Sequence, residues 1–176
     1  MFELPPIPTW DGLHPLIIHF PIALLLVAPL FIILGLLFAR HRRLLMISAL
    51  VLMVLGTASA FVAVSTGEAA GKLADRTPEV NQVLQHHEEL AERTRLTFTV
   101  LTVVFAGLLL GPAVLKRPLA TVPAVVLTLL FLGVYAAGTV VLANTAHNGG
   151  RLVHELGVRS LMPPPPVTTA SSTADD

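Results

Sequence analysis

The amino-acid sequence predicts an all-α membrane protein: a bundle of four transmembrane helices with an amphipathic helix in the 65–95 connection. Of its 176 residues, 54% are hydrophobic and only 12% are charged, and the mean hydropathy is +0.78. This composition is far more apolar than that of a soluble domain. Four apolar segments are also long enough to cross a hydrocarbon core about 30 Å thick at about 1.5 Å per residue.

The first predicted membrane helix spans about 15–38, after an outward N-terminal segment at 1–14. Pro15 suits the first turn of a helix, where its missing N–H costs nothing. Pro21 and Pro29 lie inside the segment, and we expect them to bend or loosen the helix because each removes a backbone donor.

The transmembrane domain is predicted to cover 15–158, with three further helices at about 44–64, 96–115 and 119–146. Residues 65–68 have the composition of a turn, and Gly149 and Gly150 are expected to stop the fourth helix. The segment 159–176 begins with a proline run and continues with small polar residues. It is therefore predicted to be a disordered tail.

The 65–95 connection is predicted to contain an amphipathic helix that begins near Pro78. Thr77 reads as its N-cap, and Glu79 lies in its first turn. Apolar residues and one histidine then recur at helical spacing on one face: Val80, Val83, Leu84, His87, Leu90 and Ala91. We expect His87 to point inward, and the helix to be able to continue into the third membrane helix.

Charge distribution predicts the orientation of the chain. The short connections at 39–43 and 116–118 contain five of the eleven Lys and Arg residues, whereas all eleven acidic residues lie on the other side. Basic residues in short loops are typical of the cytoplasmic face. The sequence thus predicts a multi-pass protein of the cell inner (plasma) membrane, with both termini and the 65–95 connection on the periplasmic side.

The sequence argues against several classes of function. The chain has no cysteine, which excludes disulfides and iron–sulfur ligation. Its formal net charge is zero, so no nucleic-acid partner is expected. There is no HExxH, nucleophile elbow or phosphate-binding loop, so the sequence does not indicate a hydrolase or a nucleotide enzyme and leaves open whether the protein is an enzyme. No ionisable residue lies midway along a predicted span, which argues against an ion transporter.

Six of the seven histidines fall on the predicted outward side: His14, His19, His86, His87, His147 and His154. Each of the four helices has one end there, so His19, His87 and His147 can converge at one mouth of the bundle. His19 is five residues beyond His14, or about 7 Å deeper along a helix. Each histidine also has a purely structural explanation: His14 could be a helix cap, and His19 could donate a hydrogen bond to a backbone carbonyl. An intramembrane histidine is nevertheless a candidate functional residue.

Three kinds of site fit such a cluster, and spacing alone leaves them open. One is a b-type haem with axial imidazoles from facing helices, and with Arg151 or Arg95 near its propionates. Another is a zinc or copper site with Glu68 and three histidines as ligands: His19, His87 and His147. The third is a metal-free set of polar contacts between helix ends.

Three motifs lie at these positions: HPLIIHFPIA at 14–23, TGEAA at 66–70 with HEEL at 87–90, and HNGGRLV at 147–153. Together they resemble a bacterial membrane family of uncharacterised function, known as domain of unknown function 2231, over about residues 10–158. The resemblance implies a four-helix membrane domain, with matched histidines at His14, His19, His87 and His147. Its layout is similar to that of four-helix b-type cytochromes, and relatives of this type are sometimes associated with redox proteins.

The chain departs from the family pattern near its end. Where a Tyr-Glu-His-Gly run is expected, it has His154-Glu155-Leu156-Gly157, so no role is carried over to His154.

The leading hypothesis is a haem b or metal site for electron transfer on the outward side, in a protein that contacts the bilayer and a redox partner protein. His19 and His147 are expected to be the deepest pair, followed by His87 and His14, with Arg151 near the cofactor. The alternative is a cofactor-free membrane subunit or scaffold that docks a partner. A third possibility is a transporter or sensor that titrates its histidines.

Overall fold

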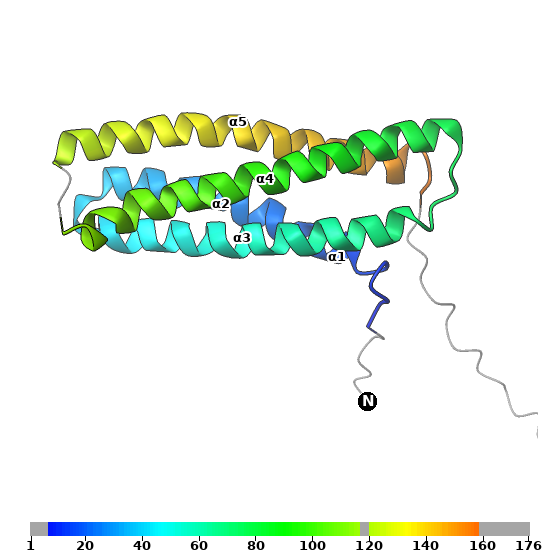
Figure 1. Cartoon of the computed structure of the whole chain (residues 1–176), viewed down its shortest axis with the longest axis horizontal. Coiled ribbons are helices and arrows are strands. Elements are labelled where there is room, and N and C mark those ends of the chain that lie inside the picture. Colours follow the sequence, from blue (N-terminus) through cyan, green and yellow to red (C-terminus); the bar gives the residue numbers. More distant parts are fainter. Residues whose placement is uncertain (1–6, 117–119, 159–176) are drawn as a thin grey trace, which may run out of the picture.

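The computed structural model describes residues 7–116 and 120–158, and every regular element in these residues is a helix. Four long helices lie side by side, and helices that follow one another in the chain run antiparallel (Figure 1). All four segments are long and apolar enough to cross a membrane. The predicted four-helix membrane bundle is therefore confirmed. The predicted tail at 159–176 lies outside the described residues.

The first membrane segment consists of two helices, α1 (His14–Ile17) and α2 (His19–Leu37), which are separated at Ile18. Pro21 has no N–H to donate to the carbonyl four residues before it. The next helical hydrogen bond, from the N–H of Ile22 to the carbonyl of Ile18, is long at 3.4 Å. The proline therefore accounts for the break, in agreement with the predicted loosening.

A second proline links two helices through the bundle core. Pro29, inside α2, leaves the carbonyl of Leu25 without its helical donor. Tyr135, on α5 (Thr121–His154), donates its hydroxyl hydrogen to that carbonyl at 2.7 Å. Tyr135 is only 1% exposed, and the ring of Phe98 meets it edge-on with centroids 5.4 Å apart. A contact between helices thus replaces the hydrogen bond that proline removes.

After a short 3-10 turn, η1 (Ala39–His41), helix α3 (Arg42–Gly71) is longer than predicted. The turn predicted at 65–68 is wrong, because these residues are helical. Thr66 is completely buried, and its hydroxyl lies 3.0 Å from the carbonyls of both Val62 and Ala63 in the same helix. This internal hydrogen bonding satisfies the threonine without breaking the helix.

Helix α4 (Pro78–Val114) joins the amphipathic helix and the third membrane helix without interruption, as the sequence allowed. The side chain of Thr77 accepts a hydrogen bond from the N–H of Val80 at 3.2 Å, which confirms the predicted N-cap. The predicted inner face packs against α5 in a small apolar cluster of buried residues: Val80, Val83, Leu84 and Leu152.

Helix α5 continues through Gly149 and Gly150, so the stop predicted there is wrong. The helix ends instead just before Gly157, which has a φ of +67°. The N–H of Val158 donates to the carbonyl of Leu152 at 2.9 Å, which closes the helix end. A glycine in the left-handed conformation is the usual residue at such a position.

The two ends of the bundle differ in composition. At one end lie α1, the last turns of α3, the first turns of α4 and the last turns of α5 (Figure 1). This end contains most of the histidines and is called the histidine end below. The opposite end contains η1, the start of α3, the end of α4 and the start of α5, and is called the arginine end. The main apolar core lies between them.

Candidate functional site

His14 begins α1 and contacts α3. Its Nδ1 lies 2.9 Å from the carbonyl oxygen of Ala63 and 3.2 Å from the hydroxyl oxygen of Thr66. Because a carbonyl oxygen can only accept, Nδ1 carries the proton and donates it. The edge of the ring rests on Gly67, where an added Cβ would lie 2.8 Å from Cε1 of the imidazole. Glycine is therefore needed at this position for His14 to reach α3.

His87, on α4, makes the corresponding contact with α5. Its Nδ1 lies 3.0 Å from the carbonyl oxygen of Thr145 and must donate to it. Its ring rests on Gly149, where an added Cβ would lie 3.0 Å from Cε1. The hydroxyl of Thr145 lies 2.7 Å from that of Thr94 and 3.1 Å from the carbonyl oxygen of Leu90, and these contacts also join α4 to α5.

The two contacts follow one pattern. In each, a histidine donates from Nδ1 to a carbonyl of the membrane segment that follows its own, and the glycine four residues beyond that carbonyl accommodates the ring. Fixing the proton on Nδ1 leaves Nε2 with a lone pair in the neutral ring. Metal-bound histidines are commonly oriented in this way, by an N–H donated to a backbone carbonyl.

His14 and His87 line one cavity of about 890 Å³ at the histidine end, which we call the histidine cavity. Pro15, Val64, Leu84 and Leu152 form part of its apolar wall. Among the described residues, five carboxylates and one arginine also line it: Asp11, Glu68, Glu88, Glu89, Glu92 and Arg93. Glu88 is packed on Gly71, where an added Cβ would lie 3.2 Å from its Oε1.

His19 and His147 are placed differently. Both side chains are exposed, and neither lines the histidine cavity. Helical geometry gives the reason: five residues separate His19 from His14, a rotation of about 140°. Two residues separate His147 from Gly149, a rotation of about 200°, so His147 lies on the far side of α5 from the His87 contact. The structure therefore gathers His14, His87 and Glu68, and does not bring His19 and His147 to them.

No group of three or more His, Asp or Glu side chains within 7–116 and 120–158 is placed to hold a metal ion as it stands. The candidate site is thus a pair of imidazoles with carboxylates near them.

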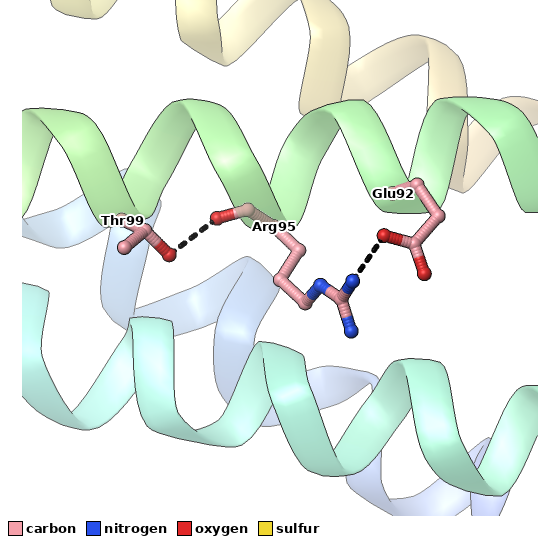
Figure 2. A network of polar contacts seen from close by, with 3 residues as sticks. All are labelled: Glu92, Arg95 and Thr99. Carbon is pink, nitrogen blue, oxygen red and sulfur yellow. Dashed lines mark hydrogen bonds and ion pairs between the residues drawn. The ribbon is translucent and has the colours of Figure 1, made fainter.

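The arginines proposed from the sequence lie outside the cavity lining. Arg151 pairs with Glu155 through Nε at 2.9 Å. Arg95 pairs with Glu92, and its carbonyl accepts a hydrogen bond from the hydroxyl of Thr99 (Figure 2). The guanidinium of Arg95 also lies over the ring of Phe61, 5.1 Å from its centroid. Arg93 is the arginine among the described residues that lines the cavity, and it too has an acidic partner, Glu89, at 3.9 Å.

Sequence reasoning missed the two glycines that accommodate the histidines. Gly67 was assigned to a turn and Gly149 to a helix stop, because glycine is common at both kinds of position. A usable signal was present: each glycine lies in a motif next to a polar residue, Thr66 or Asn148, on a segment predicted to end near the histidines.

The fold and the paired histidines thus define a four-helix membrane protein with a two-imidazole cavity at one end. Residues 11–161 match the family described as predicted membrane protein (DUF2231), and the chain belongs to this family. The resemblance inferred from the three motifs is therefore confirmed. Searches of curated proteins and of solved structures find no match.

Proposed function

We propose that His14 and His87 would hold a haem b in the histidine cavity, and that the protein transfers electrons in the membrane. The observation that carries this proposal is the pair of matching contacts in which each ring is fixed through Nδ1 and keeps Nε2 for a ligand. Two imidazoles suffice for a six-coordinate haem, so the absence of a third nearby ligand among the described residues is no obstacle.

The residues present fit such a group. A cavity of about 890 Å³ lies in the size range of cofactor pockets. Its wall is apolar near Val64, Leu84 and Leu152, which suits the face of a porphyrin. Gly67 and Gly149 let each imidazole pack closely against the neighbouring helix that it contacts, α3 for His14 and α5 for His87.

In this proposal the chain contributes positioning and exclusion of water. The carbonyls of Ala63 and Thr145 hold the two rings in one tautomer and one orientation. The apolar cluster around Leu84 and Leu152 shields one side of the cavity. Arg93 lines the cavity and would supply positive charge to an anionic group there, in addition to its pair with Glu89 at 3.9 Å. Haem b, when bound, supplies reversible one-electron chemistry.

A zinc or copper site is the second candidate, and the acidic lining favours it. Glu68 and Glu88 face the same cavity as the two histidines, and carboxylate with imidazole is a common ligand set for these metals. Binding would require side-chain movement, since the described residues are not arranged as a ligand set.

The proposed location is the cell inner membrane, with the histidine end on the periplasmic side. The support is the distribution of basic residues: five of the eleven Lys and Arg residues lie in the two short connections, 39–43 and 116–118, at the opposite end. A redox partner protein is then expected to approach from the periplasm.

The test is an absorbance spectrum and metal analysis of the chain purified in detergent, before and after addition of haemin. We expect a Soret band and one low-spin haem per chain. Bound zinc or copper without a Soret band would support the second candidate. A colourless, metal-free protein that binds neither haemin nor metal would overturn both, and would favour a cofactor-free subunit that docks a partner.

A further inference from the structure

A second cavity lies at the arginine end, and we call it the arginine cavity. Its volume is about 390 Å³, and it lies between α3, the last turns of α4 and the first turns of α5. Three arginines line it: Arg40, Arg42 and Arg43. From this arrangement we propose that the arginine cavity binds one acidic phospholipid, with its phosphate at the arginines and one acyl chain between α4 and α5.

Within the part of the chain that the structure describes, no carboxylate balances the positive charge at the arginine end. Every Asp and Glu in 7–116 and 120–158 lies toward the histidine end. The three ion pairs among these residues lie on the same side. Arg42 donates from Nε to the carbonyl of Gly35 at 3.3 Å, which stabilises the end of α2 and leaves its terminal nitrogens available. Arg40 and Arg43 are exposed. Arginine binds phosphate through paired N–H donors, so the three side chains favour a phosphate group.

The inner part of the same cavity is apolar. Met46 and Phe105 are buried and line it, together with Leu108, Leu109, Ala124 and Leu127. Thr128 also lines the cavity, and its hydroxyl donates to the carbonyl of Ala124 within α5. A free phosphate ion would gain nothing from these side chains, whereas a hydrocarbon chain would bury apolar surface against them. The lining therefore fits a ligand with an anion at one end and a chain at the other.

An acidic headgroup fits better than a zwitterionic one. A choline or ethanolamine group would place a positive charge beside three arginines that have no carboxylate among the described residues to compensate it. Basic pockets between transmembrane helices are known sites for acidic lipid headgroups. The cytoplasmic leaflet, where the charge distribution places this end, is also the leaflet rich in such lipids.

The bound lipid would join the two halves of the bundle. The first half consists of α1 to α3, and the second half consists of α4 and α5. The arginines lie on η1 and the start of α3, while Leu108, Leu109 and Leu127 lie on α4 and α5. A single lipid can therefore contact both halves at the end farthest from the histidine cavity, and this site is independent of any cofactor there.

The test is native mass spectrometry of the full chain with phosphatidylglycerol or phosphatidylcholine of identical acyl chains. We expect one retained phosphatidylglycerol and no specific retention of phosphatidylcholine. The double variant R40Q/R43Q should weaken retention by about 30-fold. The control K116Q removes a cation at the same end that does not line the cavity, and it should change retention much less.

A second variant keeps the test decisive if loss of arginines disturbs insertion. A124W fills the arginine cavity and leaves every charge in place, so it should abolish retention of phosphatidylglycerol. Equal retention of the two lipids, or unchanged retention by A124W, would overturn the proposal. Displacement of the lipid by excess inorganic phosphate would show a simple anion site and would also overturn it.

Discussion

The two halves of the bundle present a histidine to the same cavity, but they support it differently. In the first half, His14 lies on a four-residue helix that Pro21 separates from α2, and its ring makes the closer glycine contact, on Gly67. In the second half, His87 lies within the continuous helix α4, and the Thr94–Thr145 contact reinforces its position. The first histidine thus depends on tight packing, and the second on a long helix and additional hydrogen bonds.

The largest effect is expected from removing either ligand. H14A and H87A should each leave a single imidazole and convert a six-coordinate, low-spin haem to a five-coordinate one, measured by absorbance after haemin addition. The two variants should lose low-spin haem equally, despite their different supports. If H14A or H87A alone kept the low-spin spectrum, that residue would not be a ligand.

The next largest effect is expected from removing the hydrogen bond of Tyr135, which joins the two halves. Y135F leaves the carbonyl of Leu25 buried without a donor, which should lower the free energy of unfolding in detergent by about 1–3 kcal/mol. P29A restores the helical N–H to that carbonyl, so Y135F should cost less in a P29A background. An equal cost of Y135F in both backgrounds would show that Pro29 is not the reason for the tyrosine contact.

Substitutions at the two glycines should show which half packs its histidine more tightly. G67A places a Cβ 2.8 Å from the His14 ring, and G149A places one 3.0 Å from the His87 ring. Overpacking of this kind costs about 1–3 kcal/mol, and we expect G67A to cost more. The matched control is G133A, a helical glycine where nothing lies within 4 Å of an added Cβ. G133A should be neutral or stabilising by up to about 1 kcal/mol in thermal or chemical unfolding. A larger cost for G149A would reverse the ranking.

The smallest effect is expected from Arg151, which the sequence placed near the cofactor. Its pair with Glu155 is partly exposed, so R151A should change the free energy of unfolding by less than about 1 kcal/mol. It should also leave the haemin titration unchanged, because Arg151 does not line the cavity. Weaker haem binding by R151A would restore the role inferred from the sequence.

Much of the fold could be predicted from the sequence. Hydrophobic length identified the four membrane segments, and the Thr77 cap with the apolar face after it identified the start of α4. The ends of α3 and α5 could not be predicted in the same way. Gly67 and Gly149 look like helix breakers in isolation, but both lie inside helices, where each accommodates a histidine ring.

The site was predicted less completely. The inward orientation expected of His87 agrees with its contact on Gly149 and its place in the cavity lining. The depth of a residue in the membrane does not show which way its side chain points around the helix axis. Depth alone therefore could not show that His14 faces the cavity and His19 does not, or that His147 points away from the side of α5 that contacts His87. That direction depends on how the helices pack, and on the break that Pro21 introduces between His14 and His19.

The most direct test of haem binding by His14 and His87 is a haemin titration of two double variants, followed at the Soret band. H14A/H87A removes the pair that lines the histidine cavity, and H19A/H147A removes the exposed pair. H14A/H87A should lose low-spin haem completely, whereas H19A/H147A should titrate like the unmodified chain. Loss of haem by H19A/H147A, with binding kept by H14A/H87A, would contradict the proposal.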